Sequence, residues 1–234
     1  MISRLLCVVI GYAFGLIQSG YVAGKIHGID IREHGSGNSG ATNTLRVLGT
    51  RAGLLVLLCD ALKCIVAIVL TYFIFGKTNP ELKLLFRLYT ALGVILGHNF
   101  PFWLNFKGGK GIAATAGLII SFGPLWVVVN LLIFALAFLT THFVSLGSLL
   151  IYGAFFVEIV LCGQLGVFNT AGVVIPQAVL IEMYAITLIL TIMAYWRHRK
   201  NILRLLHHEE SKVYLTKKIG NKHKEEIKDQ KPII

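Results

Sequence analysis

Charged residues are scarce in this sequence. They make up 14% of its 234 residues, whereas a soluble domain of this size carries about 25%. Hydrophobic residues reach 56%, and the mean hydropathy is +0.74. So large an apolar surplus needs a lipid environment. The composition therefore predicts an all-α integral membrane protein with one membrane domain.

Several catalytic and metal-binding patterns are also missing. No histidine has an aspartate five positions later, and there is no G-x-S-x-G elbow, P-loop or zinc signature. No cluster of aspartates offers ligands to Mg²⁺. The four cysteines, Cys7, Cys59, Cys64 and Cys162, lie in apolar stretches without a C-x-x-C, so we expect neither disulfides nor a metal. We therefore expect no cofactor, and the absence of these motifs is compatible with a reaction between substrates that themselves carry phosphate groups.

Apolar runs and their breakers predict seven transmembrane helices, or six if 112–140 is a single helix. The predicted helices span about 5–24, 53–75, 84–100, 112–122, 125–140, 143–162 and 177–196. With seven, most Lys and Arg residues fall on the side of the connectors 25–52 and 101–111 and of the chain after 196. The positive-inside rule then places the N-terminus outside and the C-terminus in the cytoplasm.

Eleven of the 22 basic residues follow position 196. Aromatic residues are not interleaved with them, so anionic membrane lipid is the expected partner and nucleic acid is not. We expect a membrane domain over residues 1–204 and a basic, poorly ordered cytoplasmic tail over 205–234.

Seven helices would bring three polar segments to one side of the membrane. The first polar segment is "HGSGNSGATNTLR" (34–46), the second is "GHNFPFWLNFKGGKG" (97–111) and the third is "WRHRKNILRLLHHEE" (196–210). In the second, glycine backbone N–H groups, two lysines and a helix N-terminus are suited to a phosphate. Taken singly, each is also compatible with a simpler interpretation: a Gly/Ser/Asn turn for the first, a flexible basic loop for the second and a basic membrane anchor for the third.

Two further features concern ionisable side chains. Asp60 and Lys63, three residues apart within an apolar helix, are expected to pair. His198 and Asn201 share a helix face, and His198 is a candidate proton carrier that cationic neighbours would keep neutral.

Taken together, the polar segments resemble the three motifs of the bacterial membrane-integral glycerol-3-phosphate acyltransferases that use acyl-phosphate as donor. The matching stretches are "GSGNSGATNTLRVLG" (35–49), "GHNFPFWLNFKGGKGIAA" (97–114), "RHRKNILRL" with Glu210, and "DALK" (60–63). The resemblance implies seven helices in the bacterial inner membrane, with the active site facing the cytoplasm. It implies acyl transfer to the 1-hydroxyl of sn-glycerol 3-phosphate, giving lysophosphatidic acid and phosphate in the first step of phospholipid synthesis.

The resemblance also implies site residues and partners. The implied catalytic residues are Ser36, Arg46, Lys110, His198 and Asn201. The implied substrate- and phosphate-binding residues are Gly37, Asn38, Thr42, Asn43, His98, Lys107, Gly108, Gly109 and Ser145. The enzymes that make acyl-phosphate and add the second acyl chain are implied partners. The alternative from another class is a transporter of a small phosphate ester, whose polar site should reach both membrane faces.

The sequence departs from the family pattern at five positions. Lys200 stands where Glu is usual and His208 where Gly is usual; Ala114, Cys64 and Ser39 are the other three. The two departures in the third polar segment bear on its detailed geometry.

Overall fold

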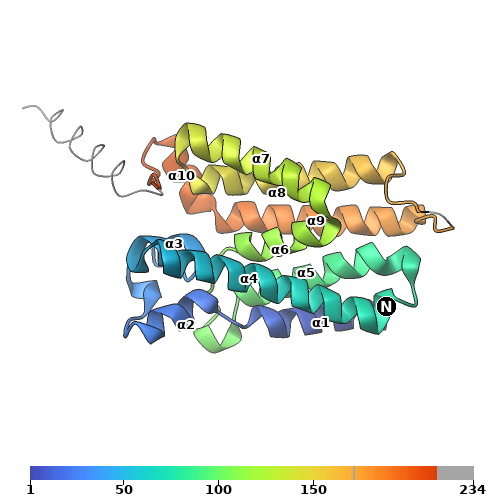
Figure 1. Cartoon of the computed structure of the whole chain (residues 1–234), viewed down its shortest axis with the longest axis horizontal. Helices are drawn as coiled ribbons and strands as arrows, with labels where there is room; N and C mark the ends of the chain where they lie inside the picture. Colours follow the sequence, from blue (N-terminus) through green and yellow to red (C-terminus); the bar gives the residue numbers. More distant parts are fainter. Residues whose placement is uncertain (171, 215–234) are drawn as a thin grey trace, which may run out of the picture.

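The protein is a bundle of helices, described by a computed structural model over residues 1–170 and 172–214 (Figure 1). The α-helices are α1 Ile2–Gly15, α2 Ser19–Ile26, α3 Ala41–Leu48, α4 Thr50–Thr71, α5 Lys83–Asn99, α6 Ile112–Phe122, α7 Pro124–Thr141, α8 Val144–Gln164, α9 Gln177–Arg197 and α10 Arg199–Leu206. Short turns of other helix types are η1 Ile31–Glu33, η2 Tyr72–Gly76, η3 Pro80–Leu82 and η4 Phe102–Leu104.

The long helices follow the apolar runs of the sequence. Five segments in the described residues are long and apolar enough to span a membrane. Helices α5 and α6 are shorter, with 17 and 11 residues. The predicted break between α6 and α7 is confirmed, because Gly123 has a φ of 121° and Pro124 begins the next helix. The predicted break after α7 is also confirmed: His142 ends that helix with a left-handed φ of 60°.

The first apolar run contains a break that the sequence did not predict. Residues 16–18 separate α1 from α2, where one helix over about 5–24 was expected. The buried Gln18 amide donates hydrogen bonds to the carbonyls of Gly15, Gly97 and His98, at 3.1–3.2 Å. Because these acceptors lie partly on α5, tertiary contacts stabilise an interruption that local propensity does not favour.

Glycines bring α1 and α5 into direct backbone contact. Each helix carries a G-x-x-x-G pair, Gly11 with Gly15 and Gly93 with Gly97. A Cβ on any of the four would lie 2.1–2.3 Å from a carbonyl oxygen of the other helix. Such small-residue faces let membrane helices pack closely. This contact fixes the C-terminal end of α5, which leads into the second polar segment.

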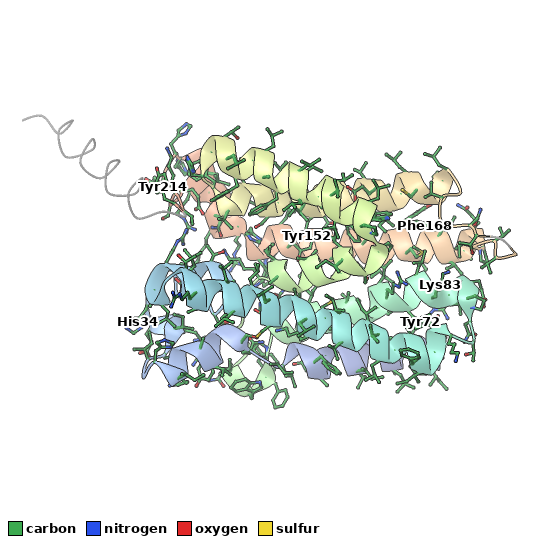
Figure 2. The ribbon with its side chains drawn as sticks, in the orientation of Figure 1. His34, Tyr72, Lys83, Tyr152, Phe168 and Tyr214 are labelled. Atoms are coloured by element: carbon green, nitrogen blue, oxygen red, sulfur yellow. The ribbon has the colours of Figure 1, made fainter. Side chains whose placement is uncertain are left out.

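The ends of the bundle differ in character. Helices α3 and α10 lie at one end and residue 1 at the other (Figure 1). His34 and Tyr214 mark the first end in Figure 2, and Lys83 and Phe168 the second. At the second end, the Arg4 guanidinium pairs with the Glu182 carboxylate at 2.7 Å. The connectors that carry the three polar segments therefore gather at the α3–α10 end.

The chain beyond residue 204 begins as part of the fold. The Val213 N–H donates to the His142 carbonyl at 2.9 Å, and the Val213 side chain is buried. Folded structure thus extends past the expected domain boundary at 204. Residues 215–234 of the expected tail lie outside the described residues.

Candidate active site

A cavity of about 790 Å³ lies where the three polar segments meet. Eight Lys and Arg side chains line it, against four Asp and Glu. Thirteen predicted site residues line it as well: Ser36, Gly37, Asn38, Thr42, Asn43, Arg46, His98, Lys107, Gly108, Lys110, Ser145, His198 and Asn201. The remaining predicted site residue, Gly109, is buried and does not line the cavity. A concave, mostly cationic site of this kind favours anionic ligands.

The first polar segment is a loop held by one buried amide. The Asn43 side chain accepts from the Ser36 backbone N–H at 2.8 Å and from the Ser36 hydroxyl at 3.1 Å. Its Nδ2 donates to the carbonyls of Ile31 and His34. Asn43 is only 1% exposed, so it shapes the loop from inside and presents Ser36 to the cavity.

The same segment is partly helical. The sequence predicted a connector over 25–52, but residues 41–48 form α3, preceded by an Asx turn in which the Asn38 side chain accepts from the Gly40 N–H at 2.9 Å. Arg46 lies in the last turn of α3 and reaches across to the Ser211 carbonyl at 3.3 Å. The helix therefore brings a cation of the first polar segment to the chain that directly follows the third.

In the second polar segment, the glycines serve close packing. The N–H groups of Gly108 and Gly109 donate to the carbonyls of Asn99 and His98, at 3.2 and 3.0 Å. A Cβ on Gly108 would lie 2.0 Å from the His98 carbonyl oxygen. This corrects the expectation that these N–H groups bind phosphate, because both cap the C-terminus of α5.

Lys110 and the start of α6 remain as the anion-binding part of that segment. The Arg197 guanidinium donates to the carbonyls of Gly108 and Gly109, at 2.9 and 2.6 Å, and holds the loop against α9. Gly111, with a φ of 81°, then turns the chain into α6. The first N–H groups of an α-helix have no partner within the helix, and Gly111 and Ile112 line the cavity here. This helix N-terminus is suited to a phosphate.

A chain of hydrogen bonds links Lys110 to the third polar segment. The Lys110 ammonium donates to Asn201 Oδ1 at 2.5 Å, and Asn201 Nδ2 donates to Glu210 Oε1 at 2.7 Å. Glu210 also accepts from the Ser145 hydroxyl at 2.9 Å and from Arg204 Nε at 2.7 Å. Burial alone would raise the pKa of Glu210, but these donors outweigh burial and hold the pKa below its ordinary value.

Burial and mutual repulsion disfavour the charged forms of the cations in the cavity wall. Burial, together with Arg204, Arg197 and Arg46, lowers the pKa of Lys110 to about 8. Burial also lowers the pKa of the Arg46 guanidinium. A bound dianion would relieve this cost and raise both pKa values, so anion binding and protonation of Lys110 favour each other.

His198 is neutral in this setting, as the sequence predicted. Burial, followed by the charges of Lys110 and Arg197, lowers its pKa to about 4. Its Nδ1 lies 2.8 Å from the Ala194 carbonyl oxygen. A carbonyl only accepts, so the proton sits on Nδ1 and the Nε2 lone pair is free to accept.

Comparisons with known proteins agree with this site. The family model for glycerol-3-phosphate acyltransferase matches residues 5–208. A glycerol-3-phosphate acyltransferase of Halalkalibacterium halodurans is 38% identical over 89% of this chain and 94% of its own. One of Bacillus subtilis is 36% identical over 89% and 96%. This chain belongs to that family.

Two solved structures share its fold. Both are crystal structures of PlsY (YgiH), an integral membrane glycerol 3-phosphate acyltransferase. The glycerol 3-phosphate form is 31% identical, with a TM-score of 0.75, over 91% of this chain and 96% of that one. The lysophosphatidic acid form is 30% identical with a TM-score of 0.73 over the same shares. This chain therefore has the same membrane fold as these two structures of the family.

The structure accommodates the two departures from the family pattern in the third polar segment. His208 has a φ of 58°, a left-handed conformation that glycine adopts without cost. Lys200 is exposed at the rim of the cavity, where a change of charge leaves the buried contacts of Asn201 intact. Neither departure interrupts the hydrogen bonds between Lys110 and Glu210.

Sequence reasoning missed three residues of this wall. Glu210 entered only as part of a motif, and Arg197 and Arg204 only as members of a basic run. Their roles depend on a chain reversal after α10, which brings Glu210 back to Ser145 and Asn201. In the sequence, the one sign of this role was that the third motif includes Glu210, an acid at the end of the third polar segment.

Replacing Asn43 by Ala should destabilise the folded protein. The change removes four hydrogen bonds and leaves the buried Ile31 carbonyl without its side-chain donor, at a cost of roughly 2–4 kcal/mol in the free energy of unfolding. The thermal midpoint in detergent should fall clearly. Asn38→Ala, which removes one loop hydrogen bond, is the matched control and should fall less. Equal midpoints for the two variants would contradict the role given to Asn43.

Proposed function

We propose that this protein transfers a fatty acyl group from acyl-phosphate to the 1-hydroxyl of sn-glycerol 3-phosphate. The products are lysophosphatidic acid and inorganic phosphate. The observation that carries the proposal is the cationic cavity formed by the three polar segments, in a chain of the glycerol-3-phosphate acyltransferase family. Both substrates carry a negatively charged phosphate group, which complements the excess of positive charge in this cavity.

The phosphates of the two substrates bind to Arg46, Lys110 and the start of α6. Arg46 offers a planar fork for two phosphate oxygens, and Lys110 a compact charge. Lys107, Gly37 and Thr42 lie around the same opening. Held together, the two substrates need no additional cofactor to meet, because proximity and charge neutralisation lower the barrier.

The acyl group moves in one displacement, without an acyl-enzyme. The glycerol 1-hydroxyl oxygen attacks the acyl carbonyl carbon, a new ester C–O bond forms, and the bond from that carbon to the phosphate oxygen breaks. The departing phosphate takes the electron pair. The hydroxyl proton goes to a phosphate oxygen or to the free lone pair on His198 Nε2. Ser36 and Asn201 orient the groups that react.

The acyl chain extends from the cavity toward lipid. Apolar side chains form part of the cavity wall, among them Leu57 of α4 and Phe134 of α7. The outer faces of both helices carry exposed leucines, such as Leu58 and Leu136, which suit contact with acyl chains of the bilayer. The donor therefore keeps its tail in the membrane while its phosphate enters the cationic site.

The charges also support a proposal for the membrane orientation. Seven spans, with the N-terminus outside and the C-terminus in the cytoplasm of a bacterial inner membrane, are supported by the excess of Lys and Arg at the α3–α10 end. The active site then faces the cytoplasm, where glycerol 3-phosphate is available. The enzymes that form acyl-phosphate and add the second acyl chain are the proposed partners.

One assay tests the reaction. The purified protein in detergent should form lysophosphatidic acid from palmitoyl-phosphate and glycerol 3-phosphate in the presence of EDTA. Product from palmitoyl-CoA but none from palmitoyl-phosphate would overturn the donor. In sealed proteoliposomes, uptake of glycerol 3-phosphate without acylation would support the transporter alternative instead.

A further inference from the structure

Three buried side chains at the wall of the cavity form a hydrogen-bond network. Lys63 Nζ lies 2.7 Å from Asp60 Oδ1, 2.6 Å from the Ile17 carbonyl oxygen and 2.9 Å from His98 Nδ1. The predicted Asp60–Lys63 pair is thereby confirmed. Asp60, Lys63 and His98 are 1%, 5% and 3% exposed. The Ser19 hydroxyl donates to the same Asp60 oxygen at 3.0 Å.

The network determines where the His98 proton lies. A lysine ammonium has three N–H donors and no acceptor, and here it has three partners. Its contact with His98 therefore makes Nδ1 the acceptor. A neutral imidazole with a lone pair on Nδ1 carries its proton on Nε2. Asp60 supplies the counter-charge that keeps Lys63 protonated in a buried setting.

The two cavity histidines are thus held in opposite tautomers. His98 lines the cavity with Nδ1 occupied, so the nitrogen left for a ligand is Nε2–H. His198 lines it with Nδ1–H bonded to the Ala194 carbonyl, so the nitrogen left is an Nε2 lone pair. One ring can only donate and the other can only accept. Each tautomer is fixed by protein atoms rather than by substrate.

Gly109 is part of the same arrangement. A Cβ on this residue would lie 2.0 Å from His98 Nε2. Any larger residue would displace the ring or cover that nitrogen. The glycine therefore contributes to the site although it does not line the cavity, because it leaves the His98 N–H uncovered.

We propose that Asp60 and Lys63 are positioning residues that fix His98 as a permanent hydrogen-bond donor, whose Nε2–H binds an anionic oxygen of acyl-phosphate. This inference rests on the proposed function and deepens it. His98 keeps its proton throughout, so it stabilises charge on the phosphoryl or developing carbonyl oxygen and does not act as a base. The accepting role falls to His198 or to phosphate itself.

The tautomers can be read without any assay of activity. Protein labelled with ¹⁵N-histidine, in detergent near pH 7, should show His98 with a bare Nδ1 and a protonated Nε2. His198 should show the reverse, and the signals are assigned by their loss in His98→Gln and His198→Gln. In the charge-neutral double variant Asp60→Asn with Lys63→Met, the His98 signals should shift toward a mixture. A proton on Nδ1 of His98 in the wild-type protein would overturn the proposal.

A pair of isosteric variants tests the donor itself. His98→Gln places an amide N–H near the position of Nε2, whereas His98→Asn reaches only the position of Nδ1. The second should lower kcat/KM for palmitoyl-phosphate by about 10²-fold, and the first should retain most of it, with the KM for glycerol 3-phosphate unchanged in both. Equal losses would overturn the donor role. Absence of acyl transfer by the wild-type protein would instead refute the proposed function and leave the tautomer result standing.

Discussion

Lys110→Met should lower acyl transfer by about 10³-fold, because it removes a positive charge that we propose neutralises the substrate phosphates. Lys110 joins the second polar segment to the third through its 2.5 Å contact with Asn201. Methionine keeps the volume of the side chain and removes its charge. Steady-state rates with palmitoyl-phosphate and glycerol 3-phosphate measure the effect.

Lys110→Arg is the matched control. It keeps the charge and should retain far more activity than Lys110→Met, and both proteins should elute as folded, monodisperse particles in detergent. Wild-type turnover in Lys110→Met would remove the residue from the site.

The same residue sets an expected pH dependence. A lysine with a pKa of about 8 is charged below that pH and loses its charge as the pH rises through it. Activity in subsaturating substrate should therefore fall above about pH 8. His198, with a pKa of about 4, stays neutral down to the acid range and should add no loss between pH 5 and 7. In Lys110→Arg, the fall above pH 8 should move to higher pH.

The bundle could be predicted from the sequence because its signals are local. Long apolar runs, and breakers such as Gly123 and His142, determine where helices begin and end, and the bounds agree within a few residues. The break at Gln18 could not be predicted, since its amide is satisfied by carbonyls of Gly97 and His98, which lie on another helix. A polar residue inside an apolar run shows its partner only once the chain has folded.

The candidate site divides in the same way. The residue types that suit phosphate are visible in the sequence, and thirteen of them line one cavity. The role of each individual residue cannot be predicted from the sequence. Asn43 holds a loop together from inside, and the N–H groups of Gly108 and Gly109 cap a helix. These roles depend on which neighbours fill each hydrogen bond, and spacing along the chain does not contain that information.

Glu210→Gln should lower turnover by about 10²-fold while leaving the transmembrane helices in place. The carboxylate accepts from Ser145, Asn201 and Arg204 at 2.7–2.9 Å. An amide has one acceptor oxygen, so at least one donor must lose its partner or face an NH₂ group. Asn201 would then be free to rotate, and Lys110 would lose the group that aims its ammonium.

The expected signature separates this role from general destabilisation. Because Glu210 acts through Asn201 on Lys110, Asn201→Ala should cost about as much as Glu210→Gln, and the double variant should cost little more than either single change. Independent, additive losses would contradict the coupling. The fall above about pH 8 should also shift in Glu210→Gln, because the carboxylate raises the pKa of Lys110. Its loss lowers that pKa further, so the decline should begin at lower pH than in the wild-type protein.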